Sequence, residues 1–398
     1  MRTINEIEND LQPIFKKVDD IAYKNQVRIL NAFKNCNITS SHFAGTTGYG
    51  YSDLGREKLC QLFAEVFQTE DAIVSPLLTC ATHALTVALF GILKSNDTMF
   101  AITGKPYETL DDIIQKEGIG GFKDYLIGYE EADIYKQDFA EIEKRLLFVK
   151  PKLVFIQRSR GYNWIQGLSK DDIVKLTKRI RQLLPETYIF LDNCYGEFTY
   201  EEEPTKYLDV CVGSLIKNAG GGIAGTGAYI VGSKRAIEQI AGRFTSPSIG
   251  NEVGSFEFGY RNYFEGLFLA PQVVKNASKG GTLIAQVLKD KGFEVLPDVD
   301  GEINDIVKSI RFNDKEKLIK FVQLVQKYAP VDSNFVPEPY DMAGYNEQVI
   351  MASGSFVGGS SIELSCDAPI KEPYIGYFQG GLTYEHCKYV AEMVLQEL

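Results

Sequence analysis

Short apolar runs that alternate with helical patterns constrain the fold of this 398-residue chain more than any other feature. The runs occupy residues 72–75, 99–103, 152–157, 188–192, 210–214 and 227–231. Runs that are apolar on both faces are typical of strands that helices cover on both sides. Because strands joined through helices make right-handed crossovers, the pattern predicts an α/β fold around a mostly parallel sheet.

The segment between the runs at 152–157 and 188–192 predicts one connecting helix in detail. Ser169 is a candidate N-cap, and Pro185 ends the helix before the next strand. The buried stripe of this helix comprises Ile173, Leu176, Ile180 and Leu183. Strand, helix and strand in this order form one parallel unit.

Changes of pattern along the chain divide it into three parts. Near the N-terminus, an amphipathic stripe with spacings of four, three and four residues comprises Leu11, Phe15, Val18 and Ala22. Beyond residue 285, strands and helices are mixed, and residues 384–398 form a candidate terminal helix. We therefore expect an N-terminal helical arm over 1–48, a large domain over 49–285 and a smaller α+β domain over 286–398.

Composition and charge argue against several classes of protein. A hydrophobic fraction of 44% with 24% charged residues is ordinary for a globular chain, and the net charge of −11 opposes binding to nucleic acid or anionic lipid. The longest mainly apolar run, residues 84–93, is too short to span a membrane, and the N-terminus is acidic where a secretory signal needs an apolar core. Seven cysteines without a C-x-x-C pair and three histidines predict neither a disulfide framework nor a structural metal. We expect a cytoplasmic protein.

A glycine-rich segment after the run at 210–214 matches the dinucleotide-binding pattern G-x-G-x-x-G at Gly220, Gly222 and Gly225. In a true dinucleotide turn, the third glycine stands where a helix begins. Here residues 226–232 are β-branched and aromatic, and they predict a strand instead. The pattern therefore does not indicate a nucleotide site.

A lysine and an aspartate stand at the carboxyl ends of two predicted strands. Lys217 follows the run at 210–214, and a lysine near apolar surroundings can have a lowered pKa and form a Schiff base as an amine nucleophile. Asp192 ends the run at 188–192, and its buried charge requires a cation such as a protonated pyridine nitrogen. A solvated lysine and an ordinary turn aspartate would fit the same pattern.

A candidate phosphate site precedes the predicted helix at 84–93. Ala81 and Thr82 lie where the N-terminus of that helix offers free N–H groups and the positive end of its dipole. Ser214 can supply a further donor, and Tyr107 offers an aromatic face, although a routine helix cap and plain surface residues would look the same. A phosphate site at the helix N-terminus, a carboxylate at Asp192 for a pyridine nitrogen and an amine at Lys217 together describe a site for pyridoxal 5′-phosphate.

Five motifs carry a resemblance to a known family. They occupy residues 48–56, 156–162, 192–198, 213–218 and 379–383. The chain resembles, over nearly its whole length, the pyridoxal-phosphate-dependent carbon–sulfur lyases of the aluminium-resistance, or methionine γ-lyase-like, family, which is related to cystathionine lyases. The resemblance implies the transferase-like fold of fold-type I with a seven-stranded sheet, and a homodimer or homotetramer.

The resemblance also implies roles for the cofactor-binding residues. Lys217 would form the Schiff base, Asp192 would pair with the pyridine nitrogen, and Tyr107 would stack on the ring and protonate the leaving thiol. The residues implied to hold the phosphate are Ala81, Thr82 and Ser214, together with Tyr49 or Tyr51 and Arg56 of the neighbouring subunit.

The sequence departs from the family pattern in two places. Cys80 and Ala81 stand where related lyases usually have serine and glycine, which leaves the phosphate cup more dependent on backbone N–H groups. Lys371 stands where an arginine is expected for the substrate carboxylate, and lysine cannot make a bidentate fork. Carboxylate binding is therefore assigned to Lys371, Arg158 or Arg160.

The implied reaction is elimination of a thiol from a sulfur-containing L-amino acid of the cystathionine or methionine type, after removal of the Cα proton. Its products are a 2-oxo acid, ammonia and the thiol. An aminotransferase or a decarboxylase would use the same anchors. A non-catalytic cofactor-binding stress-response protein would also fit them, and a nucleotide-binding protein is the least favoured interpretation.

Overall fold

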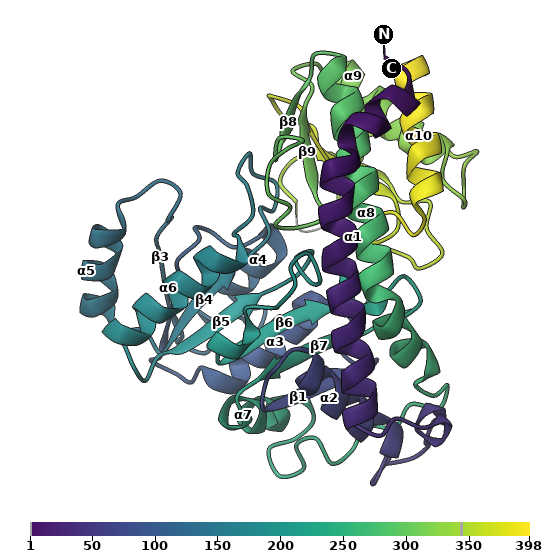
Figure 1. The fold of residues 1–398 in the computed structure, drawn as a ribbon. Coiled ribbons are helices and arrows are strands. Elements are labelled where there is room, and N and C mark those ends of the chain that lie inside the picture. Colours follow the sequence, from purple (N-terminus) through teal and green to yellow (C-terminus); the bar gives the residue numbers. More distant parts are fainter. Residues whose placement is uncertain (1, 343–344) are drawn as a thin grey trace.

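The computed structural model describes residues 2–342 and 345–398, and two sheets dominate it (Figure 1). The larger sheet has the strand order β1-β7-β6-β5-β4-β2-β3, and only β7 runs antiparallel to its neighbours among these strands. Its strands are β1 (Asp71–Ser75), β2 (Thr98–Ala101), β3 (Gly128–Glu131), β4 (Leu153–Gln157), β5 (Tyr188–Asp192), β6 (Val210–Ser214) and β7 (Ala228–Gly232). This confirms the predicted α/β class and the mostly parallel seven-stranded sheet.

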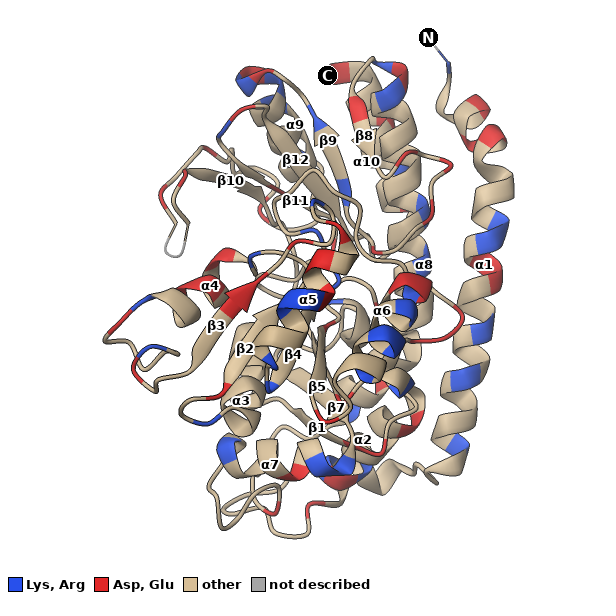
Figure 2. Cartoon of the chain, turned by 90° about the vertical axis from the view of Figure 1, so that its left-hand side faces the viewer, with Lys and Arg blue, Asp and Glu red and all other residues tan. Residues whose placement is uncertain are grey.

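The sequence pattern missed one strand of this sheet, β3. All residues of β5 and β6 are buried, as expected for apolar runs in the middle of a sheet, whereas β3 lies at the edge and ends in two exposed glutamates, Glu130 and Glu131. Figure 2 shows β3 in the colour of acidic residues beside strands that are mostly uncharged. An edge strand needs no continuous apolar run, and the strand-by-strand pattern therefore could not detect it.

Helices cover both faces of the large sheet. One face packs against α3 (Ala81–Ile92), α4 (Glu108–Gln115) and α7 (Lys234–Phe244). The other packs against α2 (Leu54–Val66), α5 (Phe139–Val149), α6 (Lys170–Leu183) and α8 (Arg261–Asp290). Helix α6 confirms its predicted start, because the Ser169 side chain accepts from the Asp172 N–H at 3.0 Å. Of its predicted stripe, only Leu183 is half-buried rather than buried.

Two long helices lie side by side along one flank of the molecule (Figure 1). The N-terminal helix α1 (Ile4–Asn35) packs along α8, and a capping box between Thr3 and Glu6 fixes its first turn. The predicted amphipathic stripe is buried at each of its four positions, Leu11, Phe15, Val18 and Ala22. Among the described residues, no helix is long and apolar enough to cross a membrane.

The second sheet is antiparallel and has a core of its own. It has the order β10-β11-β12-β9-β8, and α9 and α10 pack with it. Its elements are β8 (Glu294–Leu296), β9 (Lys308–Arg311), α9 (Lys315–Lys327), β10 (Val349–Ala352), β11 (Ser365–Pro369), β12 (Ile375–Gln379) and α10 (Tyr384–Glu397). Helix α8 runs across residue 285, and the domain limits at 48 and 285 remain predictions.

Helix α8 approaches the segment after β6 backbone to backbone. A Cβ atom on Gly266 would overlap the carbonyl oxygen of Gly220, and one on Gly221 would overlap the carbonyl oxygen of Gly266. Gly221 also has φ +57, in the left-handed region that glycine adopts at little cost. This contact fixes the loop that begins at Lys217 against the helix.

We predict that Gly266→Ala destabilises the fold by about 1–3 kcal/mol, because the added methyl group must push α8 away from the loop. In an exposed helix, the same change would stabilise by up to about 1 kcal/mol. Gly225→Ala is the matched control, since Gly225 has negative φ and no atom within 4 Å of an added Cβ. Urea unfolding of both variants measures the difference, and equal stability of the two would contradict the close contact.

Candidate active site

A cavity of about 380 Å³ opens at the carboxyl ends of β4 and β5 and at the N-terminus of α3, and the second sheet forms its opposite wall. Among the residues predicted for the site, those that line the cavity are Ala81, Thr82, Tyr107, Asp192, Lys217 and Lys371. Those that do not line it are Tyr49, Tyr51, Arg56, Arg158, Arg160 and Ser214. The structure thus brings together six residues from five separate stretches of chain.

Asp192 is the last residue of β5 and is only 5% exposed. Its Oδ1 accepts a hydrogen bond from the Cys194 N–H at 3.1 Å. Burial raises the pKa of Asp192, and the positive charge of Lys217 opposes that rise. No Lys or Arg nitrogen of the described chain forms an ion pair with this carboxylate within 4 Å, so its buried charge is poorly compensated.

Lys217 follows β6, and its Nζ lies 4.0 Å from the centroid of the Tyr195 ring. Burial alone would lower the pKa of Lys217, but the acidic groups of Cys194, Tyr195 and Asp192 outweigh it and hold that pKa well above its usual range. The lowered pKa predicted from the sequence is therefore wrong for the protein chain alone. The amine is held as an ammonium ion over an aromatic face.

The N-terminus of α3 is arranged to bind an anion. Cys80 is the N-cap, and its Sγ accepts from the His83 N–H at 3.4 Å, which leaves the N–H groups of Ala81 and Thr82 without a protein partner among the described residues. The hydroxyl groups of Thr82 and Tyr107 share a hydrogen bond of 2.9 Å. Cys80 thus caps the helix at the position where related lyases usually have serine. The two residues after it, Ala81 and Thr82, line the cavity and keep free backbone N–H groups.

Tyr107 stands between the helix terminus and the central strands. Its N–H donates to Gln157 Oε1 at 3.0 Å, and Gln157 lies beside Asp192 in the register of β4 and β5. Burial, followed by the charge of Asp192, raises the pKa of Tyr107 far above neutrality. Its hydroxyl therefore carries a proton at neutral pH. Ser214, by contrast, is buried, and its hydroxyl accepts from the Ile216 N–H at 3.3 Å.

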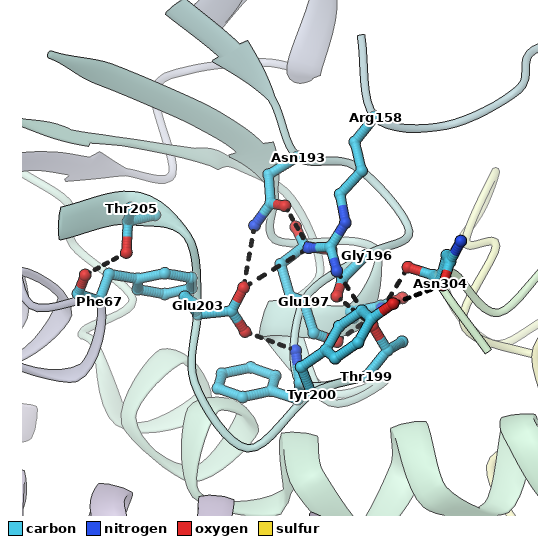
Figure 3. Close-up of polar contacts among 12 residues, drawn as sticks. Phe67, Arg158, Asn193, Gly196, Glu197, Thr199, Tyr200, Glu203, Thr205 and Asn304 are labelled. Atoms are coloured by element: carbon cyan, nitrogen blue, oxygen red, sulfur yellow. Dashed lines mark hydrogen bonds and ion pairs between the residues drawn. The ribbon is translucent and has the colours of Figure 1, made fainter. Parts of the chain in front are cut away.

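Both arginines proposed for a carboxylate point away from the cavity. Figure 3 shows the Arg158 guanidinium group turned toward Asn193 and Glu203, with Arg158 Nη1 donating to Asn193 Oδ1 at 2.6 Å. Arg160 Nη2 forms a buried ion pair with Asp305 at 3.1 Å. These guanidinium groups are engaged in structural contacts, which corrects their assignment to a substrate. Of the three candidate cations, only Lys371 lines the cavity.

The residues expected to act across a subunit boundary lie outside this cavity. Tyr49 and Tyr51 are 75% and 60% exposed. Arg56 is buried, and its guanidinium group donates to the backbone carbonyls of Gly50, Glu252 and Gly254. It therefore orders the loop that carries the two tyrosines, and a contribution to a neighbouring site remains a prediction.

Asn218 supports the turn that carries Tyr195. Its Nδ2 donates to the carbonyls of Tyr195 at 3.0 Å and Glu197 at 2.9 Å. Tyr195 and Phe198 have φ of 73° and 63°, a region that side chains other than glycine rarely adopt. The side chain next to Lys217 thus holds a strained turn in place against that lysine. The sequence contained Tyr195 and Asn218 within quoted motifs, but nothing in the motifs indicated this contact.

Comparisons with known proteins agree with this geometry. The family model described as methionine gamma-lyase matches residues 1–398. The chain belongs to the methionine gamma-lyase family. This confirms the family resemblance and the assignment to an enzyme family.

Individual relatives cover nearly the whole chain. The protein YnbB of Bacillus subtilis (strain 168) is 40% identical over 393 residues, which are 97% of this chain and 93% of YnbB. The structure of a carbon–sulfur lyase involved in aluminum resistance from Clostridium novyi NT is similar to this one, with a TM-score of 0.94 and 43% sequence identity. The match covers 99% of this chain and 95% of the Clostridium chain. The pyridoxal-5′-phosphate-dependent protein YhfS of Escherichia coli, at 13% identity and a TM-score of 0.65, shares the fold over 96% of this chain and 97% of its own.

We predict that Asn218→Ala lowers the pKa of Lys217 toward its ordinary value, because the turn that carries Tyr195 loses its support. The pH dependence of reductive methylation at Lys217 in the cofactor-free protein, read by peptide mass spectrometry, measures this pKa. Asn25→Ala is the matched control, since Asn25 Nδ2 donates to the carbonyls of Phe198 at 3.3 Å and Tyr200 at 2.8 Å in the same loop. Both variants should lose about 1–3 kcal/mol of stability. The same lysine pKa in both would refute the positioning role of Asn218.

Proposed function

We propose that this protein is a pyridoxal-phosphate-dependent carbon–sulfur lyase. Its substrate would be a sulfur-containing L-amino acid of the cystathionine or methionine type, and its products a thiol, a 2-oxo acid and ammonia. The observation that carries the proposal is the meeting of Lys217, Asp192 and the free N-terminus of α3 in one cavity. The carbon–sulfur lyase from Clostridium novyi NT, which is 43% identical, supports it.

The residues present fit the cofactor on physical grounds. The buried carboxylate of Asp192 is poorly compensated, and a protonated pyridine nitrogen would supply the cation that it needs. The free N–H groups of Ala81 and Thr82, with the dipole of α3, suit a phosphate. Lys217 offers the amine that would hold the aldehyde. A volume of about 380 Å³ lies in the range of small-molecule sites.

When bound, pyridoxal phosphate would supply an electron sink for negative charge at the substrate Cα. Asp192 would keep the pyridine nitrogen protonated, because a carboxylate stabilises the charged form. Lys217 would accept the Cα proton as the general base.

The remaining roles concern the leaving group and the substrate carboxylate. Tyr107, which is protonated at neutral pH, would donate a proton to the departing sulfur. Lys371 is exposed at the rim and would bind the carboxylate as a point charge rather than as a bidentate fork. Ser214 Oγ accepts from the Ile216 N–H, which leaves the hydroxyl proton of Ser214 to donate to a phosphate.

We also propose a homodimer or homotetramer. Tyr49 and Tyr51 are exposed on a loop that Arg56 orders from beneath, which suits a contribution to the site of a neighbouring subunit. In that arrangement, the separated subunit would be inactive.

Lys217→Ala is expected to abolish both turnover and the visible absorbance of bound pyridoxal phosphate, because the amine that holds the cofactor and moves the proton is gone. Lys206→Ala, which removes a surface ion pair with Glu202 and a contact with the Tyr207 ring, is the control and should retain both. Assays follow thiol and ammonia released from L-cystathionine and L-methionine. A yellow, active Lys217→Ala variant would overturn the assignment, and transfer of the amino group to a 2-oxo acid without thiol release would identify an aminotransferase instead.

A further inference from the structure

The wall of the cavity that faces Lys217 comes from three neighbouring strands of the second sheet. Met351 on β10, Asp367 on β11 and Tyr377 on β12 stand opposite one another in the register, and all three line the cavity. A single carboxylate therefore lies in the middle of a wall that the Met351 thioether, the Tyr377 ring and the Gln379 amide complete. The proposed elimination mechanism assigns no role to the Asp367 carboxylate.

The Asp367 carboxylate lacks a committed cation. Its Oδ2 accepts from Gln379 Nε2 at 3.0 Å, and no ion pair within 4 Å reaches it from the described residues. Burial raises the pKa of Asp367 to about 6, so the group is still mainly ionised at pH 7. The positive charge of Lys217 opposes that rise. In the proposed function, however, the Lys217 amine is occupied by the cofactor, and the Asp367 carboxylate would then keep its charge only beside another cation.

The other two lysines of the cavity do not form an ion pair with Asp367. Lys105 Nζ forms an ion pair with Asp111 at 2.8 Å. Lys371 is exposed at the rim, where its charge acts on Glu108. Neither contributes to the pKa of Asp367. The ammonium group of a ligand would supply the positive charge that the described residues do not place beside Asp367.

Three tyrosine rings surround the space in front of this carboxylate. The ring of Tyr162 lies 5.0 Å from that of Tyr377 and 5.8 Å from that of Tyr345, and all three rings line the cavity. After burial, the charge of Asp367 is the next cause that raises the pKa of Tyr162, and it also raises that of Tyr345. Electron-rich ring faces around one carboxylate favour an ammonium group over a neutral or anionic one.

We propose that Asp367, with Tyr162, Tyr345 and Tyr377, binds a second ammonium group, one carried by the departing thiol of the substrate. This inference rests on the proposed function and narrows its substrate class to sulfur amino acids whose thiol fragment is itself an amine. Asp367 is then a residue that determines specificity. L-Methionine, whose leaving group is a plain alkyl thiol, would leave the Asp367 charge uncompensated.

The test compares two substrates that differ only in the distal ammonium group. L-Cystathionine and S-(3-carboxypropyl)-L-cysteine have the same length, and the second has hydrogen in place of the distal amino group. Because the analogue reacts only by β-elimination, the cystathionine rate is taken from pyruvate. If 2-oxobutyrate is the main product instead, S-(2-carboxyethyl)-L-homocysteine is the matched analogue, scored in the same way.

The wild-type holoenzyme is expected to prefer cystathionine by about ten-fold or more in kcat/KM, as a buried charge-assisted contact implies. Asp367→Asn should bring this ratio close to one. Asp19→Asn, which removes a negative charge that pairs with Lys279 away from the cavity, should keep the wild-type ratio. The visible absorbance of bound cofactor reports that each variant is folded and loaded.

Two failures remain distinguishable. Turnover of both substrates with a wild-type ratio near one, or an unchanged ratio in Asp367→Asn, would refute the ammonium site and leave the lyase proposal intact. Absence of thiol release from every substrate, together with absence of bound cofactor, would refute the lyase proposal and the ammonium site with it. The wild-type ratio needs no variant, so the inference stays testable even if Asp367→Asn does not fold.

Discussion

A carboxylate buried at the end of a central strand is the constraint on which the rest of the site depends. Asp192 is nearly inaccessible, and the all-buried strands β5 and β6 hold it beside the loop that carries Lys217. A charge in this position is costly unless a cation meets it. The cavity brings this carboxylate together with the N-terminus of α3 and the ammonium group of Lys217. The pyridine nitrogen of the proposed cofactor would supply the cation that Asp192 lacks.

Buried polar contacts behind the cavity join its two walls (Figure 3). Asn193, the residue after Asp192, accepts from Arg158, which also approaches Glu203 within 3.6 Å. The same loop reaches Asn304 through the hydroxyl of Thr199 at 3.2 Å. Next to it, the ion pair between Arg160 and Asp305 is fully buried, and removal of one partner of such a pair costs about 3–5 kcal/mol. The loop after β5 is therefore tied to the segment that leads into the second sheet.

Local pattern was sufficient for the elements that are buried and continuous. Every strand of the large sheet except β3 and the helix cap at Ser169 could be predicted, because burial and capping restrict which residues occupy neighbouring positions. Side-chain direction leaves no such mark, and so Arg158 and Arg160, which follow β4 as Lys217 follows β6, were assigned to the cavity although they turn away from it. The pKa of Lys217 and the place of Asp367 depend on groups that lie far apart in the sequence, and single motifs could not predict them.

Helix α8 contacts both the loop after β6 and the second sheet, which lie on opposite sides of the cavity. Its residue Gly266 rests on the backbone of Gly220, three positions after Lys217, and further along Gly281 packs against the Lys308 side chain on β9 of the second sheet. One continuous helix thus sets the separation between the lysine and the wall that carries Asp367. Substitutions that bend α8 would alter turnover and substrate preference together, whereas those at Asp367 on β11 would alter preference with the lysine unmoved.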